Sequence, residues 1–351
     1  ILAQDGIRSA SRAVSPSALC PLGTAGIMDC AAYGFNVEWF DKQADLIREY
    51  TLTLYVPEKG PVEVQMYDLK NRRTFMKRSA AAHLKLEDFR VGAMVTIHAR
   101  QLKVASYADA NTESALSVLH SDLCFCTAPS AFKKAGQIFE CLTSAGLRIV
   151  RLRLVNKDGP CFAVQVSGSD AEQRWASVQK LLPANSAARV PDVEPFFDRA
   201  RYPTTAAFDN CTLCIVRPHA VKEGGVGPVL TAIMEAGLEV AALDTLTLPR
   251  AMAAELLDVY KGVLPYYMEL IDGMSSGPLV AMEIRSSDGA CEKLRAIAGP
   301  HDVDMARHLR PTSLRAVLGK TNADNGVHAT DLEEDGELEV RYIFETVLGG
   351  K

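Results

Sequence analysis

One set of residues near the C-terminus combines the groups needed to move a phosphoryl group. Its members are Asn325, His328, Thr330, Asp331 and Glu339, with the cations Arg217, Arg295 and Arg315. An imidazole accepts a phosphoryl group when a carboxylate holds its other nitrogen and cations neutralise the phosphate oxygens. Any one of these residues alone is typical of an ordinary core or surface position. Their combination predicts a phosphohistidine site in which Glu339 holds His328.

The elements that must position these residues belong to a repeat. QIFECLTSAGL at 137–147 matches PVLTAIMEAGL at 228–238, and GPCFAVQVSGSDA from Gly159 matches GPLVAMEIRSSDGA from Gly277. The first pair is offset by 91 residues and the second by 118, so the first copy is shorter by the difference, 27 residues. Each copy predicts strand, helix and strand, then strand and helix, which is typical of an α+β sandwich. We call residues 118–182 copy one and residues 208–351 copy two; the prolines between Pro183 and Thr205 predict a linker at 183–207.

The first third of the chain has a different pattern. Residues 1–30 are rich in Ala, Ser and Gly and predict an extended arm. Residues 31–117 predict a small, mostly β module: alternating segments at 51–56 and 62–67 flank a turn and form a hairpin, and 94–99 is a third strand.

Composition excludes several classes of protein. A net charge of −5 argues against a general nucleic-acid binder. Acidic residues interrupt the most apolar stretch, 226–248, so no membrane span is expected. The nine cysteines are odd in number and follow no signal-peptide pattern, which predicts free thiols in a reducing compartment. Cys211-x-x-Cys214 could be half a zinc site, but no second ligand pair completes it and its surroundings favour a buried strand.

Copy two resembles a nucleoside diphosphate kinase domain, whose signature Asn-x-x-His-Gly-Ser-Asp reads Asn325-Gly-Val-His328-Ala-Thr330-Asp331 here. The resemblance implies a ferredoxin-like βαββαβ fold and transfer of phosphate between nucleotides, as Mg²⁺ complexes of ATP or another NTP, through His328. It assigns catalytic roles to His328, Glu339, Arg217 and Tyr260. It assigns nucleotide binding to Tyr266, Arg295, His301, Arg315, Asn325 and Thr330, with Tyr266 stacking on the base and no metal ligand from the protein.

Three departures from the family pattern concern the phosphate site. Arg217 stands where the family has lysine, and the two cations differ because Lys is a compact point charge and Arg a planar fork. His301 stands where the family has a phosphate-binding threonine. The family sequence His-Gly-Ser reads His328-Ala329-Thr330 here, so Thr330 keeps a hydroxyl and Ala329 adds a Cβ where the family has glycine.

Copy one is predicted to be a degenerate form of the same domain. Ala128 stands where the phosphate-binding cation should be, and no histidine occurs between His120 and His219. The shorter connection removes the helical hairpin that closes over nucleotide in the family. Copy one is therefore expected to be a packing or docking module.

The N-terminal module resembles the DM-ten domain, a small PH-like β-barrel with a helix found in proteins of ciliary doublet microtubules. The resemblance rests on VEWFD at 37–41, YDLKNRRTFMKR at 67–78 and LEDF at 86–89. Five of the nine residues from Lys70 to Arg78 are basic. Such a run is usually a solvated hairpin, but the interleaved Phe75 and Met76 favour docking onto acidic tubulin.

Three hypotheses about function follow. The leading one is an axonemal protein of the cilium or flagellum that binds the inner wall of the doublet microtubule, with tubulin and other axonemal proteins as partners. The second is an active nucleoside diphosphate kinase working through phospho-His328. The third is a module that binds nucleotide without turnover.

Overall fold

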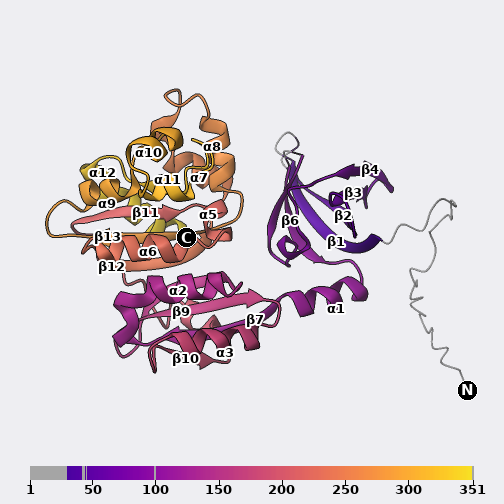
Figure 1. The fold of residues 1–351 in the computed structure, drawn as a ribbon. Helices are drawn as coiled ribbons and strands as arrows, with labels where there is room; N and C mark the ends of the chain where they lie inside the picture. Colours follow the sequence, from indigo (N-terminus) through magenta and orange to yellow (C-terminus); the bar gives the residue numbers. More distant parts are fainter. Residues whose placement is uncertain (1–29, 42–43, 45, 99, 350–351) are drawn as a thin grey trace, which may run out of the picture.

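The computed structural model describes residues 30–41, 44, 46–98 and 100–349. They form an N-terminal sheet module and two α+β units that share one sheet (Figure 1). Except for Cys30, the predicted arm at 1–30 lies outside the described residues. Among the helices of the described ranges, none has the length and apolar character that crossing a membrane requires.

The N-terminal module is a six-stranded antiparallel sheet in the order β4-β3-β2-β1-β6-β5. Its elements are β1 Cys30–Asp41, β2 Leu46–Pro57, β3 Glu63–Asp68, β4 Arg73–Ala80, η1 Leu86–Asp88, β5 Met94–Ile97, β6 Arg100–Tyr107 and α1 Ala110–Leu119. The predicted hairpin is confirmed, because β2 and β3 pair antiparallel. Alternation places Phe35, Leu52 and Val104 in a buried core beside Phe89. Side chains also link the two edges of the sheet, since Ser79 Oγ of β4 lies 3.1 Å from His98 Nε2, just after β5.

The two copies have the same strand order. The elements of copy one are β7 Ser121–Thr127, η2 Pro129–Lys134, α2 Ala135–Ser144, β8 Arg148–Asn156, β9 Pro160–Gly168 and α3 Ala171–Leu181, followed by β10 Ala187–Val190 and α4 Glu194–Phe197. Those of copy two are β11 Cys211–Val216, α5 Pro218–Lys222, α6 Val226–Glu235, β12 Glu239–Thr247, α7 Arg250–Leu256, η3 Asp258–Tyr260, α8 Tyr267–Met274, β13 Pro278–Arg285, α9 Ala290–Ala298, α10 Val303–Leu309, α11 Leu314–Leu318, β14 Val327–Ala329, α12 Glu333–Arg341 and η4 Tyr342–Val347. Numbered within each copy, the strands run 4-1-3-2 across the sheet. The repeat predicted from the sequence is therefore present in the fold.

Two differences between the copies follow from their connections. In copy two, α7, η3 and α8 join β12 to β13, whereas a short turn joins β8 to β9 in copy one. The segment expected to be only a linker also contributes structure, because β10 pairs antiparallel with β7 at the sheet edge. A proline-rich stretch can hold an edge strand of four residues, since Ala187–Val190 itself contains no proline.

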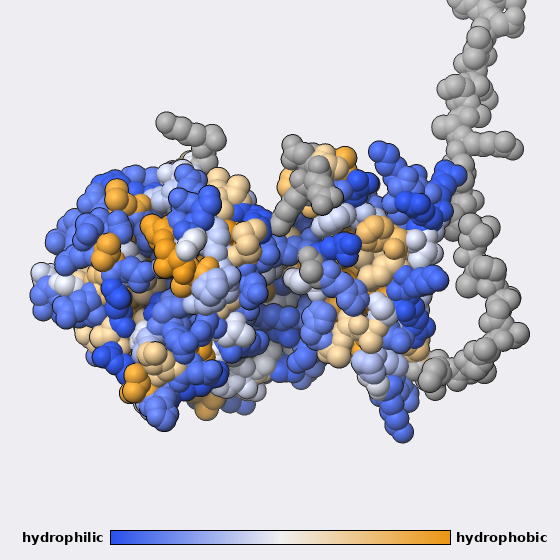
Figure 2. All heavy atoms as spheres, turned by 90° about the horizontal axis from the view of Figure 1, so that it is seen from above, coloured by the Kyte–Doolittle hydropathy of each residue, from blue (hydrophilic) through white to orange (hydrophobic). Residues whose placement is uncertain are grey.

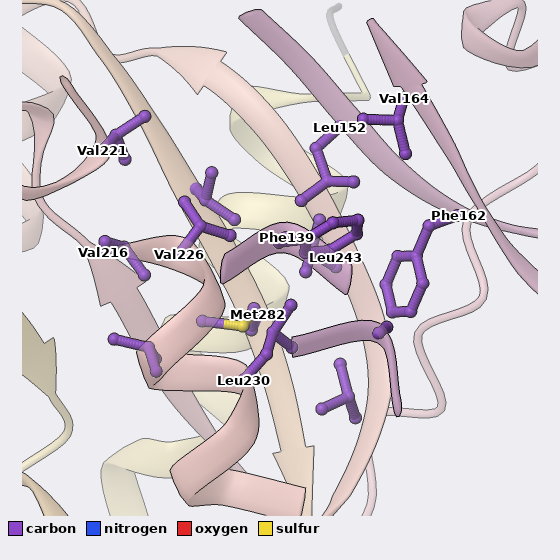
Figure 3. Packing of buried hydrophobic residues seen from close by; sticks show 14 of the residues in the cluster. Phe139, Leu152, Phe162, Val164, Val216, Val221, Val226, Leu230, Leu243 and Met282 are labelled. Carbon is purple, nitrogen blue, oxygen red and sulfur yellow. The ribbon is translucent and has the colours of Figure 1, made fainter. Parts of the chain in front are cut away.

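The two copies pair with each other within the chain. Strand β8 pairs antiparallel with β12, and Arg153 lies opposite Asp244 in this pairing, which we call the strand seam. Helices α2 and α6 cover one side of this seam and pack together. Figure 3 shows the resulting core, in which Phe139 and Leu152 of copy one lie with Leu230 and Leu243 of copy two. One continuous apolar cluster thus stabilises both copies.

Glycines set the close approach of α2 and α6. A Cβ on Gly136 would lie 2.5 Å from the backbone nitrogen of Thr231, and one on Gly227 would lie 2.8 Å from the backbone nitrogen of Glu140. Backbone atoms cannot move aside, so Gly227→Val is expected to lower the free energy of unfolding by about 3 kcal/mol. Denaturant unfolding measures this, with Gly277→Ala as the control, because a Cβ there would meet nothing nearer than Pro218 Cβ at 3.8 Å. An equal loss in both variants would contradict the tight crossing.

A buried ion-pair network fixes the strand seam. Arg153 and Asp244 are 2% exposed, and Arg153 Nε lies 3.3 Å from Asp244 Oδ2. Arg199 Nη2 donates to the same oxygen at 2.8 Å. Arg153 also donates to the backbone oxygens of Phe196 and Tyr202, at 2.9 and 2.7 Å. The segment between the copies is therefore held against both of them.

The N-terminal module contacts both copies through one carboxylate. Asp88 accepts from Lys222 Nζ of copy two at 2.9 Å and lies 3.4 Å from Arg148 Nη1 of copy one. Gln101 Nε2 donates to the backbone oxygen of Asp272 in α8 at 2.8 Å. These polar contacts orient the module relative to copy two.

Candidate active site

His328 lies at the centre of a short strand in the interior of copy two. Strand β14 pairs with β11, so that His328 stands opposite Ile215, and the histidine is 2% exposed. Its Nε2 lies 2.8 Å from Glu339 Oε2, and Thr330 Oγ1 donates to the same oxygen at 2.8 Å. In the described part of the chain Nδ1 makes no hydrogen bond. A carboxylate at Nε2 favours the tautomer that carries its proton there, which leaves the lone pair of Nδ1 available.

A close helix–strand contact brings Glu339 to this position. Helix α12 packs on β11 at Gly336, where a Cβ would lie 2.2 Å from the backbone oxygen of Cys211. Glu339 lies one turn further along the same face. Gly336 was not singled out in the sequence, since a glycine within an acidic helix gives no signal of close packing.

Two arginines with buried guanidinium groups contact the backbone beside His328, and among the described residues neither forms an ion pair with a carboxylate. Arg217 is 2% and Arg315 is 7% exposed. Arg217 Nη1 donates to Ala323 O, while its buried Nε has no partner in the part of the chain that the structure describes. Arg315 Nη1 donates to Gly299 O at 2.9 Å. Burial, followed by the charge of Arg315, lowers the pKa of Arg217 to about 10. Desolvated cations of this kind favour an anion as their partner.

The third predicted cation lies at the rim and is already paired. Arg295 donates to the backbone oxygen of Asp331, and its Nη2 lies 3.9 Å from Asp331 Oδ1. Tyr260 donates its hydroxyl to the other carboxylate oxygen of Asp331. Burial, together with this carboxylate, raises the pKa of Tyr260. Asp331 belongs to the sequence motif, but its role as the anchor of Arg295 and Tyr260 became visible only in the structure.

Asn325, His301 and Tyr266 form the remaining wall. Asn325 is fully buried, and its Nδ2 lies 3.4 Å from both Nδ1 and the backbone oxygen of His301. The His301 ring stacks on Tyr266, with ring centroids 6.3 Å apart and an angle of 22° between planes. Burial, and then the charges of Arg315 and Arg217, lower the pKa of His301 to about 4. The contacts join the predicted residues in separate groups: His328 with Glu339 and Thr330, Arg295 and Tyr260 with Asp331, and Asn325 with His301 and Tyr266. That these groups share one nucleotide site stays a prediction.

Strand pairing identifies what stands at the matching place in copy one. His328 pairs with Ile215 of β11, and Ala188 pairs with Cys126 of β7. The same hydrogen bond recurs two residues beyond Ile215 and Cys126. Arg217 N donates to Gly326 O in copy two, and Ala128 N donates to Ser186 O at the matching place beside copy one. Alanines therefore occupy the places of both His328 and Arg217 in copy one.

The cysteine pair Cys211 and Cys214 lies in β11, all six residues of which are buried. This confirms the strand predicted there. Nowhere in the described ranges do three or more His, Cys, Asp or Glu side chains gather as they would around a metal ion.

Comparison with known proteins agrees with this arrangement. The family model for nucleoside diphosphate kinase matches residues 210–347. Nucleoside diphosphate kinase homolog 7 of Mus musculus is 36% identical over 373 residues, covering 89% of this chain and 92% of that protein. The protein of the same name from Rattus norvegicus is 35% identical over 371 residues with the same coverage. A nucleoside diphosphate kinase of Aquifex aeolicus is 35% identical over 133 residues, which are 38% of this chain and 92% of that protein. The chain belongs to the family of nucleoside diphosphate kinase homolog 7, and its C-terminal part has the ferredoxin-like nucleoside diphosphate kinase fold.

Proposed function

We propose that copy two transfers the γ-phosphoryl group of a nucleoside triphosphate to a nucleoside diphosphate through His328. The observation that supports this most is the contact of His328 Nε2 with Glu339 at 2.8 Å, which leaves Nδ1 as the nucleophile. The two buried guanidiniums of Arg217 and Arg315 supply positive charge for the phosphate oxygens.

The reaction has two matching steps. The lone pair of Nδ1 attacks the γ-phosphorus, an N–P bond forms, and the bond to the β–γ bridging oxygen breaks, so that the nucleoside diphosphate leaves. Glu339 stabilises the imidazolium character that develops, because its carboxylate holds the Nε2 proton. A terminal oxygen of a second diphosphate then attacks the phosphorus and His328 leaves as the neutral base. Mg²⁺ enters with the nucleotide and neutralises part of its charge.

Steady-state exchange tests this proposal. With MgATP and GDP the full chain should produce ADP and GTP, and double-reciprocal plots at several GDP concentrations should be parallel, as for a covalent intermediate. Tight nucleotide binding without exchange would contradict phosphotransfer and favour the module that binds without turnover.

We further propose that copy one is a degenerate nucleoside diphosphate kinase domain without activity. The alanines at 188 and 128 support this, because no nucleophile or phosphate-binding cation stands at those places. Its proposed extent is 118–182, with 183–207 adding the edge strand, while 31–117 and 208–351 are the other two domains.

A second function is favoured by the N-terminal module: docking onto tubulin in the doublet microtubules of a cilium or flagellum. We propose that the six strands form a PH-like barrel of the DM-ten type, which the contact between Ser79 and His98 supports. Edge strand β4 is basic and mostly exposed, and within the described residues Lys70, Arg72, Arg73 and Lys77 form no ion pair. Lysines on an edge strand also serve to discourage aggregation, which is an alternative role for this strand. Phe75, which is 37% exposed, favours docking because it adds an apolar contact surface. Figure 2 shows one side of the molecule, where apolar patches lie among hydrophilic residues.

Co-sedimentation with microtubules checks the docking role. Replacing four basic residues with glutamate is expected to weaken binding by about tenfold or more at low salt; they are Lys70, Arg72, Arg73 and Lys77. The reason is that the new glutamates would repel the acidic surface of tubulin. The matched control replaces the exposed Lys133 and Lys134 of copy one, and His328→Ala should bind as the parent does. Equal binding by the β4 variant would contradict docking through this strand.

A further inference from the structure

Two polar atoms of the candidate active site, Nδ1 of His328 and Nη2 of Arg217, reach solvent. Among the described residues neither atom has a hydrogen-bond partner, and neither is shielded by the protein. The two residues occupy neighbouring positions of the sheet, because His328 lies opposite Ile215 and Arg217 N donates to Gly326 O at 3.0 Å. Whatever orients the Arg217 side chain therefore also decides where a phosphate beside His328 would meet this donor.

One hydrogen bond orients the Arg217 guanidinium. Its Nη1 donates to Ala323 O, whereas Nε is shielded and has no partner within the described ranges. Because Nη1 is the anchored atom, the position of the Ala323 carbonyl sets the direction in which Nη2 points. The segment that carries Ala323 thus controls a cation of the site without facing the nucleotide itself.

That segment, residues 320–326, is held in place at Asp324. Lys320 N donates to Asp324 O at 2.8 Å, and Asp324 N donates to Thr321 Oγ1 at 3.0 Å. These bonds close a tight loop around Ala323. The side chain of Asp324 is not used within the loop and is available to fasten it to another element.

The Asp324 carboxylate fastens the loop to α5. Its Oδ1 lies 3.4 Å from Nδ1 of His219, which stands two residues beyond Arg217. Both ring nitrogens of His219 are shielded, and no other polar group in the described part of the chain bonds to them. The contact with His219 holds the pKa of Asp324 below its ordinary value. Helix α8 leaves space for this carboxylate, since a Cβ on Gly273 would lie 2.7 Å from Asp324 Oδ1.

We propose that Asp324 is a positioning residue for Arg217: its contact with His219 holds the Ala323 carbonyl where it directs the guanidinium toward the transferring phosphate. This rests on the function proposed for copy two. Asp324 acts through Arg217 and does not touch the reacting atoms. Without the carboxylate, the shielded ring of His219 would lose its polar partner, which costs free energy. The loop would then relax, and the Arg217 guanidinium would move with it.

A double-mutant cycle on the full chain tests this coupling. The rate of phosphoenzyme formation is measured in single turnovers with γ-labelled ATP and Mg²⁺ for Asp324→Ala, Arg217→Ala and the two together. Asp324→Ala alone should slow labelling by about tenfold, because a small displacement of a positioned group costs at least that much. In the chain that already carries Arg217→Ala, the same replacement should change the rate by less than about twofold, since the group it positions is gone.

Three further variants separate positioning from folding. Asp324→Asn keeps an oxygen beside His219 and should recover most of the lost rate. Asp304→Ala is the matched control, because its carboxylate is 94% exposed, and it should label at the parent rate. Denaturant unfolding checks that each variant is folded. If Asp324→Ala is not folded, His219→Ala removes the other half of the contact and takes its place in the cycle.

The outcomes distinguish this proposal from the function beneath it. Equal slowing with and without Arg217, or an unchanged rate in Asp324→Ala, would overturn the positioning role. A parent that binds nucleotide without becoming labelled would overturn phosphotransfer, and the same cycle measured as affinity for MgADP would then decide whether Asp324 acts through Arg217. A parent that neither binds nucleotide nor becomes labelled would contradict both.

Discussion

Replacing Arg315 with alanine is expected to slow formation of the phosphoenzyme by ~10²–10³, the usual cost of removing one preorganised donor from a transition state. Arg315 is 7% exposed, and within the described ranges its guanidinium donates to backbone oxygens alone, at 2.9 Å from Gly299 O and 3.4 Å from Val327 O. Its positive charge is therefore available to phosphate. Single-turnover labelling with γ-labelled ATP measures the effect.

Two further variants separate charge from folding. Arg315→Lys keeps the charge but loses the planar fork, so it should recover part of the rate. Arg307→Ala removes an exposed arginine of α10 and should leave the rate unchanged. An unaltered rate in Arg315→Ala, at native stability, would contradict the role of this residue in phosphate binding.

Loss of Asp244 is expected to have the largest effect on stability. In the parent chain, Asp244 Oδ2 lies 3.3 Å from Arg153 Nε. Asp244→Ala removes this counter-charge and leaves the charge of Arg153 buried at the seam. Breaking one partner of a buried pair costs about 3–5 kcal/mol. Urea or guanidinium unfolding of the full chain measures the free-energy change.

The paired replacement is the control for this prediction. Arg153→Met together with Asp244→Leu removes both charges and should lose less than Asp244→Ala alone, since no buried charge remains unpaired. If the single variant were as stable as the parent, the seam would not depend on this pair.

Much of this fold could be predicted from the sequence because the patterns that indicate helices and strands are local. The repeated helix and strand segments predicted both copies, and alternation at 51–56 and 62–67 predicted a hairpin that is present. The motif also predicted the contact between His328 and Glu339, which is present; the shared nucleotide site stays a prediction. These are patterns of residue type at fixed spacing, which a single sequence displays directly.

What the sequence did not predict depends on close approach between distant segments. Gly336 permits α12 to contact β11, Asp331 anchors Arg295 and Tyr260, and β10 completes a sheet edge from a segment that reads as a linker. The pairing of the copies through Arg153 and Asp244 is of the same kind. Such contacts join residues far apart in the chain, and none has a periodic signature.

A phosphoenzyme assay on the full chain tests the central claim most directly. The chain is incubated with γ-labelled ATP and Mg²⁺, and the label is examined for the acid lability and base stability of a phosphohistidine. We expect one labelled site, absent in His328→Ala, that discharges onto GDP to give labelled GTP. Label that persists in His328→Ala, or no label from a chain that binds nucleotide, would contradict phosphotransfer through His328.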